Sequence, residues 1–327
     1  MSSSQVPDRA AVAAEITPPW SRRRRRSPWQ RAGNSSVPYL LVLPVIAAIG
    51  AVLAYPLYKL VVISFQKYGL FELIRRHGTW VGLDNYRSVL GDGVFWRTLE
   101  RTVVFTIANV GLTMLLGTLI ALLLVRVSSL VRVLLTVGLV LVWSMPVVVA
   151  VQVWYWMTNY QNGVLNYFLT EVHLGDYFQH DWYATNFSKL AMVTALIVWG
   201  AIPFVTITVY AGLAQVPSEL VEAAEIDGAG PLRVFRDVTF PVLKPILLIL
   251  TSLSIIWDFG VFAQPWLLVT ASGWNASNYL MGVYVYIEGY AHSDFGRGAA
   301  ISLLMLLIVA LLSVFYVRQM VKTEEAG

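Results

Sequence analysis

An all-α integral membrane protein with six transmembrane helices is the fold class that this sequence predicts. Its mean hydropathy is +0.65 and only 13% of its 327 residues are charged, which is about half the charged fraction of a soluble globular domain. Six apolar runs are each roughly 20 residues or longer, the length that a spanning helix needs. Backbone polar groups in hydrocarbon must be hydrogen-bonded internally, so long apolar runs of this kind are helices.

The six runs occupy residues 39–65, 102–125, 133–157, 190–213, 246–269 and 298–317. Lys59 lies toward the far end of the first run, where its long stem can reach the interface. Only the fifth run carries a charge near its middle, Asp258. An even number of spans places both termini on the same side of the membrane.

The distribution of basic residues indicates which side that is. With the amino terminus inside, 14 of the 23 basic residues fall in inside segments and eight in outside segments, while Lys59 stays in the first run. The five arginines at 22–26 dominate this excess, and charges near the first helix usually set orientation. We therefore predict a multi-pass protein of the cell membrane with both termini cytoplasmic. Residues 1–36 are predicted to be a cytoplasmic, basic, disordered tail, and residues 37–327 the six-helix transmembrane domain.

The connector at residues 216–245 is unusually polar for this chain, with eight charged residues of which five are acidic. Ser218 is predicted to cap a helix that begins at Glu219, and Gly228 to end it in the left-handed conformation. Pro231 suits the first position of a second helix, which two prolines four residues apart are predicted to stop before the fifth run. Neither helix is long enough to be stable alone in water, so each must lie against another structure.

The surface of the first connector helix indicates what it lies against. Glu219, Glu222 and Glu225 follow at steps of three and form a carboxylate stripe, while Ala223 and Ala224 leave a shallow patch for close approach. Anionic lipid would repel three glutamates, and helices that rest on the inner leaflet are normally basic. Docking into a soluble partner is therefore favoured over resting on the membrane.

The segment EAAEIDGAGPLRVFRDVTFPVLKP resembles the EAA loop of binding-protein-dependent ABC importer permeases. Residues 41–65 and 81–106 are similar to the carbohydrate branch of that family, and within it to the first, larger permease subunit of maltose-type importers. The resemblance covers residues 39–317 and implies the fold of a type I ABC importer permease, MetI-like. The EAA pattern matches at Glu222, Ala223, Ala224, Asp227, Gly228, Ala229, Phe235, Pro241 and Pro245.

This resemblance implies a mechanism and a set of partners. The EAA helix of the family is a coupling helix in a cleft of a cytoplasmic ATPase subunit, and closure of two such subunits on ATP alternates access in the membrane. Glu222 would pair with a basic residue of the ATPase, Ala223 and Ala224 would set the close approach, and Gly228 after Asp227 would allow the turn. The family also implies a second permease subunit in a heterodimer, an extracytoplasmic solute-binding protein and a sugar substrate.

The chain has no nucleotide-binding loop of its own. The pattern G-x-x-x-x-G-K-[ST] is missing, and none of the five lysines follows a glycine. We therefore expect no enzyme activity and no cofactor in this chain, with ATP and Mg bound by the partner ATPase subunits. The sequence has no cysteine, which excludes disulfides and thiolate metal sites. Membrane lipid is an expected contact, and nucleic acid is not.

A substrate pathway is predicted on two of the runs. Ser254, Trp257 and Asp258 share one helical face in the fifth run, with a carboxylate at membrane depth. Trp199 and Phe204 lie in the fourth run, and the resemblance to the maltose-type permease points to these two helices as the sugar site. Aromatic stacking and hydrogen bonds to hydroxyl groups would suit a sugar. A structural Asp258, bonded to a neighbouring helix, is the alternative.

Other functions remain open from the residues alone. An ion-coupled secondary transporter could use Asp258, and similar permeases carry other polar solutes such as glycerol phosphate. A membrane-embedded enzyme is disfavoured, because the four histidines form no H-E-x-x-H spacing and no G-x-S-x-G occurs.

Two outer segments leave alternatives open. The loop at residues 158–189 is rich in Tyr, Trp, Asn and His, a mixture typical either of a partner surface or of an aromatic belt. After the fifth run, the family pattern Thr-x-Gly-Gly-Pro is replaced by LVTASGWNASNYL, with Trp274 and Asn275 where the second Gly and the Pro usually stand. The contact between this loop and a binding protein is thereby in doubt.

Overall fold

The structure is a computed structural model that describes residues 37–325. The predicted basic tail at residues 1–36 lies outside the described residues, and the prediction for it is not tested. Contacts divide the chain into two units, Met1–Lys59 and Leu60–Gly327. Helix α3 (Val37–Ser64) supplies the described part of the first unit and ends within the second. All other elements belong to the second unit.

The second unit is helical apart from one small hairpin. Its first part contains β1 (Gln66–Lys67), α4 (Leu70–Arg75), β2 (Thr79–Trp80), α5 (Asp84–Leu90), α6 (Gly93–Arg126), α7 (Ser129–Trp143), α8 (Val147–Met157) and α9 (Val164–Glu171). Its second part contains α10 (Asn186–Leu213), α11 (Ser218–Ile226), α12 (Pro231–Val234), the π-helix η1 (Phe235–Thr239), α13 (Phe240–Phe259), α14 (Ala263–Val269), the 3₁₀-helix η2 (Thr270–Ser272), α15 (Met281–Tyr286), the π-helix η3 (Ile287–Ala291) and α16 (Phe295–Glu325). Strands β1 and β2 are antiparallel, with Gln66 opposite Trp80.

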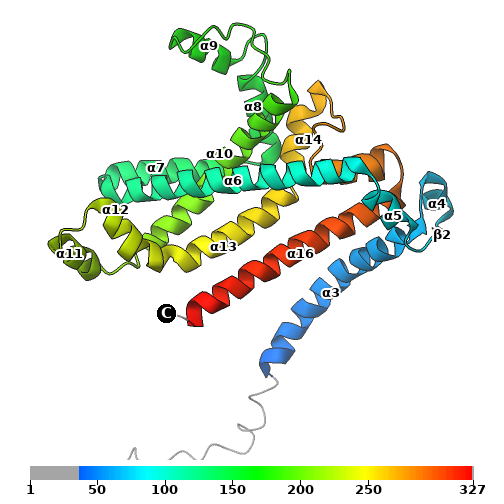
Figure 1. Cartoon of the computed structure of the whole chain (residues 1–327), viewed down its shortest axis with the longest axis horizontal. Helices are drawn as coiled ribbons and strands as arrows, with labels where there is room; N and C mark the ends of the chain where they lie inside the picture. Colours follow the sequence, from blue (N-terminus) through cyan, green and yellow to red (C-terminus); the bar gives the residue numbers. More distant parts are fainter. Residues whose placement is uncertain (1–36, 326–327) are drawn as a thin grey trace, which may run out of the picture. The chain divides into compact units, whose positions relative to one another are not determined.

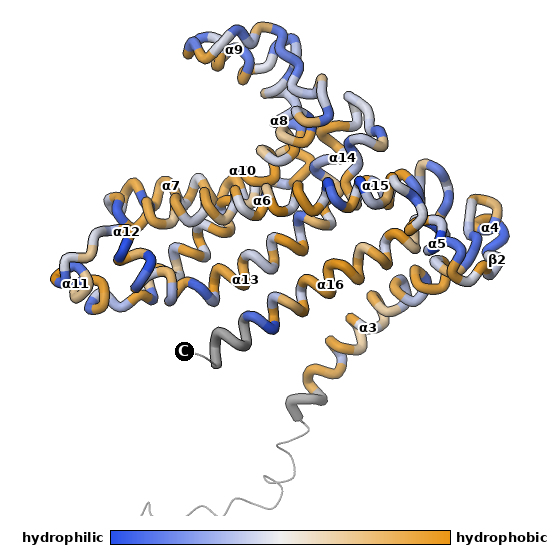
Figure 2. The backbone as a smooth tube through the Cα atoms, in the orientation of Figure 1, coloured by the Kyte–Doolittle hydropathy of each residue, from blue (hydrophilic) through white to orange (hydrophobic). Residues whose placement is uncertain are grey.

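Within residues 37–325, five helical segments are long and apolar enough to cross a membrane, in α3, α6, α10, α12–α13 and α16. The pair α7 and α8 becomes a sixth if it is counted as one bent span. Figure 2 shows the apolar colouring along α6, α10, α13 and α16 and the hydrophilic colouring in connectors such as those around α5 and α9. The predicted all-α membrane fold is confirmed, and four of the six runs correspond to single long helices.

The third and fifth predicted spans are not straight helices. The third is bent by 101° between Trp143 and Val147, because Pro146 cannot continue the hydrogen bonding of α7. The fifth was predicted to reach residue 269, but α13 ends at Phe259 and α14 starts at Ala263 after a break. At this break Gly282 lies against the chain so closely that a Cβ would be 2.5 Å from the Val261 carbonyl oxygen. The long-range packing of α15 therefore accompanies an interruption that hydropathy does not indicate.

The connector helices also differ from prediction at three residues. Ser218 is the first residue of α11 and makes no cap hydrogen bond, since Pro217 occupies the cap position. Pro241 and Pro245 do not stop the second connector helix, which passes through η1 directly into α13. A π-helical turn changes the hydrogen-bond spacing just before Pro241, where a missing N–H would otherwise interrupt the helix. As predicted, Pro231 begins α12.

Helices α6, α10 and α13 pack on one another, and Figure 1 shows them side by side. Buried apolar side chains on all three form one core, including Ala121, Val205 and Leu250. The hydroxyl of Thr206 donates to the Gly117 carbonyl across the α6–α10 contact at 3.2 Å. Short polar links of this kind add to close packing between helices in a membrane. These three helices are the frame on which the site described below is built.

An ionic cluster joins α5, α6, η3 and α16 at the N-terminal end of α6. The Arg297 guanidinium pairs with Asp92, lies 3.0 Å from Glu288 Oε2, and donates to Ser88 Oγ at 3.0 Å. Asp92 also caps α6 by accepting from the Val94 N–H at 2.8 Å. Burial raises the pKa of Asp92, but hydrogen bonds from Val94 and Arg297 outweigh burial and hold this pKa below its ordinary value.

We predict that Asp92→Asn lowers the free energy of unfolding by about 1.5–3 kcal/mol, the range for hydrogen bonds to charged groups. Because the folded-state pKa of Asp92 lies below its unfolded value, the stabilisation is complete above the unfolded pKa and is lost as pH falls through the folded pKa. The Tm difference between wild type and variant, measured on the purified protein, should shrink between about pH 7 and about pH 3. Asp84→Asn is the control, because its ion pair with Arg87 is exposed. Equal Tm shifts for both variants would contradict the prediction.

Candidate functional site

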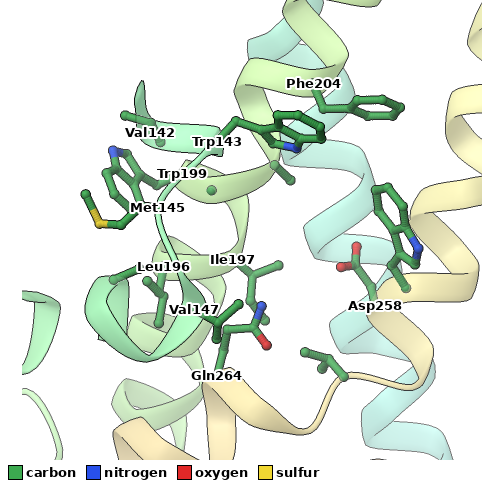
Figure 3. A pocket seen from close by; sticks show the side chains of 15 residues that line it. Val142, Trp143, Met145, Val147, Leu196, Ile197, Trp199, Phe204, Asp258 and Gln264 are labelled. Carbon is green, nitrogen blue, oxygen red and sulfur yellow. The ribbon is translucent and has the colours of Figure 1, made fainter. Parts of the chain in front are cut away.

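A pocket of about 270 Å³ lies between α7, α8, α10, α13 and α14. We call it the central pocket. Figure 3 shows it from close by, with the Asp258 carboxylate and the Gln264 amide reaching into it. Four of the five residues predicted for a substrate pathway line it, namely Trp199, Phe204, Trp257 and Asp258. The fifth, Ser254, is not among its lining residues: it is buried one turn earlier on α13.

The break after α13 positions Asp258. This residue lies in the last turn of α13, where its own carbonyl oxygen accepts the Gly260 N–H. The residue is buried, with 7% of its surface exposed. Among residues 37–325 no group donates a hydrogen bond to its carboxylate and no cation pairs with it. The structure thus offers no bond to a neighbouring helix of the kind that a purely structural Asp258 would make, and a buried polar group without a partner needs water or a ligand.

Aromatic rings form one wall of the central pocket. Trp143 stacks on Phe204 with ring centroids 6.1 Å apart, and Phe204 meets Trp257 at 5.6 Å. Trp199 lies 5.9 Å from Trp154, measured between ring centroids. Sugar rings present apolar faces that can lie on such surfaces, while Asp258 and the Gln264 amide are available to hydroxyl groups.

Sequence reasoning missed Trp143, Met145 and Gln264 as lining residues. The first two lie beside the bend at Pro146, inside a run that was read as one straight helix. Gln264 enters the pocket because α14 turns away from α13. A proline within an apolar run and a glutamine beside Pro265 were the only available signals.

Helix α10 carries a second, different cavity on another face. An apolar groove of about 690 Å³ runs between α6 and α10, and Ala195 is among its lining residues. Ala201 lines the central pocket instead. These two alanines lie six residues apart, so they point to different sides of the helix. Both are half-buried.

The residues predicted for partner coupling lie together on α11 and the turn that follows. Glu222 and Ala223 are exposed and Ala224 is half-buried. Asp227 follows the last residue of α11, and Gly228 has φ +80°, the left-handed conformation predicted for it. The Ala229 N–H donates to the Ala224 carbonyl at 2.9 Å, which closes the turn.

Large apolar side chains are exposed around the same helix. Leu220, Ile226 and Leu232 are 52%, 86% and 82% exposed. Val221 and Glu225 of α11 line a pocket together with residues of α12 and the end of α6, so the carboxylate stripe reaches the edge of that packed side. Exposed apolar side chains beside a carboxylate stripe are typical of a protein interaction surface.

The connector joins the two helices that supply most of the central pocket. Helix α10 carries Trp199 and Phe204 and leads into α11, while η1 leads from the connector into α13, which carries Trp257 and Asp258. Phe204 and Leu213 are nine positions apart, or roughly 14 Å along a helix. A displacement of the connector would therefore be transmitted to the pocket along α10 and α13, although the connector itself does not line the pocket.

The model of the family described as "Binding-protein-dependent transport system inner membrane component" matches residues 113–321. The diacetylchitobiose uptake system permease protein DasB of Streptomyces coelicolor is 42% identical over 295 residues, covering 90% of this chain and 89% of that protein. The trehalose/maltose transport system permease protein MalF of Thermococcus litoralis is 30% identical over 281 residues, covering 86% and 92%.

A solved structure shares the fold at low sequence identity. A chain of a bacterial ABC transporter involved in the import of the acidic polysaccharide alginate superposes with a TM-score of 0.72 at 16% identity, covering 90% of this chain and 98% of that chain. The predicted permease fold is confirmed by this likeness.

The faces of α10 can be compared in a background without native thiols, because the sequence has no cysteine. We predict that Ala201→Cys reacts with a small hydrophilic maleimide, since its thiol faces a pocket in which the unpaired Asp258 carboxylate requires water. Ala195→Cys, in the apolar groove, should react at least tenfold more slowly, because a thiolate does not form in apolar surroundings. Labelling rates of the two variants, measured in membranes, provide the check. Equal rates would contradict the predicted difference in water access between the central pocket and the groove.

Proposed function

Because this chain belongs to the family of binding-protein-dependent transport system inner membrane components, we propose that it is the permease subunit of an ABC importer for a carbohydrate. It conducts the sugar across the cell membrane and hydrolyses no ATP itself. The observation that carries the proposal is the connection of the α11 turn to α10 and α13, which together supply Trp199, Phe204, Trp257 and Asp258 to the central pocket. Such a connection allows movement of an ATPase subunit to open and close a pathway through the permease.

Coupling would operate through the exposed face of α11. Glu222 pairs with a basic residue of the ATPase, Ala223 and Ala224 allow close approach, and the exposed Ile226 adds an apolar anchor. Asp227 and the left-handed Gly228 turn the chain back toward α13. When two ATPase subunits close on ATP, α11 moves with them, and α10 and α13 carry this movement to the pocket. ATP and Mg belong to those subunits, because this chain has no P-loop.

Three further parts complete the proposed transporter. A second permease subunit supplies the other half of the pathway, two ATPase subunits bind the coupling surfaces, and an extracytoplasmic solute-binding protein delivers the sugar. The basic residues near the first span support a cytoplasmic amino terminus, and six spans place the carboxyl terminus on the same side.

A neutral carbohydrate is the substrate class that the central pocket favours. Its wall of Trp143, Phe204 and Trp257 suits the apolar faces of sugar rings, and its charged lining residue is Asp258. An anionic solute such as glycerol phosphate would be repelled by that carboxylate in a low-dielectric site. The names of the similar permeases, which refer to diacetylchitobiose and to trehalose and maltose, support the same class. Family membership favours ATP over ion coupling through Asp258.

We predict that Glu222→Arg separates this chain from its ATPase. The variant places a cation opposite the basic partner residue, so copurification of the ATPase from native membranes should fall at least tenfold. Glu171→Arg is the control, because Glu171 is also exposed and ends α9 at the other end of α10. Mass spectrometry of the tagged complex provides the measurement. Undiminished recovery of the ATPase with Glu222→Arg would overturn the coupling role.

For the pathway, Asp258→Ala should reduce sugar uptake by at least tenfold without loss of assembly. A hydrogen bond to a charged group is worth about 1.5–3 kcal/mol, which corresponds to about 10- to 100-fold. Ser254→Ala lies one turn away and does not line the pocket, so its uptake should stay close to wild type. Uptake of labelled diacetylchitobiose, maltose and trehalose into proteoliposomes containing the complete transporter is the measurement. Normal uptake with Asp258→Ala would return this residue to a structural role.

A further inference from the structure

A second polar cavity lies at the other end of the α8–α14 pair. Its volume is about 260 Å³, just below the roughly 300–1,000 Å³ of typical small-molecule pockets. We call it the tyrosine pocket, and its side chains include Tyr155, Asn159, Tyr160, Asp181, Tyr183 and Ser272. The space is sufficient for one sugar unit and not for a long oligosaccharide.

The walls of the tyrosine pocket are held in place by the protein. Tyr183 is buried, and its hydroxyl is 2.7 Å from the hydroxyl of Thr158. Burial raises the pKa of Tyr183 to about 12, so this phenol stays neutral. At Ser272, which also lines the cavity, the Lys189 ammonium donates to the carbonyl oxygens of Ser272 and Gly273 at 2.8 and 3.2 Å. Hydrogen bonds within the protein therefore hold the cavity wall in place at both Tyr183 and Ser272.

Asp181 and Asn159 each use one side-chain atom in a hydrogen bond to the backbone and leave the other polar atom available to a ligand. Asp181 Oδ1 accepts the Tyr183 N–H at 2.8 Å, and Asn159 Oδ1 accepts the Gln161 N–H at 2.9 Å. Within the described residues 37–325, no protein group bonds to Asp181 Oδ2 or to Asn159 Nδ2. The pocket thus presents a fixed carboxylate acceptor and a fixed amide donor.

Aromatic rings complete this arrangement. The rings of Tyr155 and Tyr183 are 6.5 Å apart and inclined at 35°, and Tyr160 is 47% exposed. A tyrosine face covers the apolar side of a sugar ring, while the acceptor and donor match neighbouring hydroxyl groups. With a carboxylate as its charged lining residue, the pocket suits a neutral ligand better than an anion.

Helix α8 links the tyrosine pocket to the central pocket. Val147 and Ala150 of α8 line the central pocket, while Tyr155 and Thr158 line the tyrosine pocket. Eight positions separate Ala150 from Thr158, or about 12 Å along the helix. The coupling turn follows the opposite end of α10, whose first turns lie beside Ser272 and Asn278. A cytoplasmic coupling turn therefore places the tyrosine pocket toward the outer side.

We propose that the tyrosine pocket is a second carbohydrate subsite, which holds one sugar unit on the outer side before the sugar reaches the central pocket. The inference rests on the proposed carbohydrate import. In the loop at residues 158–189, Asp181 and Tyr183 would thus contribute a ligand site in addition to an aromatic belt or a partner surface.

The test uses the complete transporter in nanodiscs without its binding protein. Every sample carries Asp258→Ala, so that sugar binding in the central pocket is weakened. The probes are diacetylchitobiose, maltose and trehalose, and the one that wild type takes up is used for titration calorimetry. Asp181→Asn combined with Tyr160→Ala should weaken binding of that sugar about tenfold, because a charged acceptor and a stacking face are lost. Asn retains the oxygen that accepts the Tyr183 N–H.

A matched pair of substitutions provides the control. Asp176→Asn changes a carboxylate that likewise accepts the N–H two residues later, and Tyr167→Ala removes a tyrosine that is 69% exposed; neither residue lines the pocket. This pair should leave binding unchanged. Equal binding by the two double variants overturns the subsite while carbohydrate import stands. If the wild-type transporter takes up none of the three sugars in the presence of ATP and binding protein, the carbohydrate proposal is overturned and the subsite with it.

Discussion

The interruption of the helix after Phe259 is the constraint on which the candidate pathway depends. If α13 continued straight through residue 269, Asp258 would lie within an uninterrupted helix and Gln264 would project elsewhere along it. The interruption turns α14 toward α8 and leaves Asp258 in a final helical turn that faces an open space. Close packing of Gly282 on the Val261 carbonyl accompanies this geometry, since any larger residue would meet the backbone.

A second consequence concerns the path of mechanical force. Helices α10 and α13 pack against α6 and against each other, and each continues directly into the polar connector. Packed helices transmit displacement because protein interiors have low compressibility. The aromatic wall from Phe204 to Trp257 spans these two helices, so a relative rotation of α10 and α13 would change the pocket at once. Exposed Glu222 and Ile226 lie where such a rotation could be imposed from outside the membrane.

Charged groups in the apolar part of the fold fall into two classes that behave differently. Arg297 and Lys189 are both well supplied with acceptors, the first by Asp92 and Glu288 and the second by carbonyl oxygens of the η2 turn. Their bonds connect elements far apart in sequence and stabilise the structure. Asp258 has no such partner in the described residues. This contrast separates groups that hold the fold together from a group that is available to a ligand.

The sequence by itself determined the membrane class, four spans that each form a single long helix, the Gly228 turn and the faces that carry Trp199, Phe204, Trp257 and Asp258. These features depend on composition, on helical periodicity and on residue types whose backbone preference is local. Only the tertiary structure decided that the third and fifth spans are interrupted, that Trp143 and Gln264 line the pocket while Ser254 does not, and that Lys189 is buried. Each of these results from contacts between residues distant in the chain, such as Gly282 with Val261 or Lys189 with Ser272. Hydropathy is an average over neighbouring residues and does not report such contacts. The periodicity of the sequence is likewise unchanged where packing against a distant segment interrupts a helix.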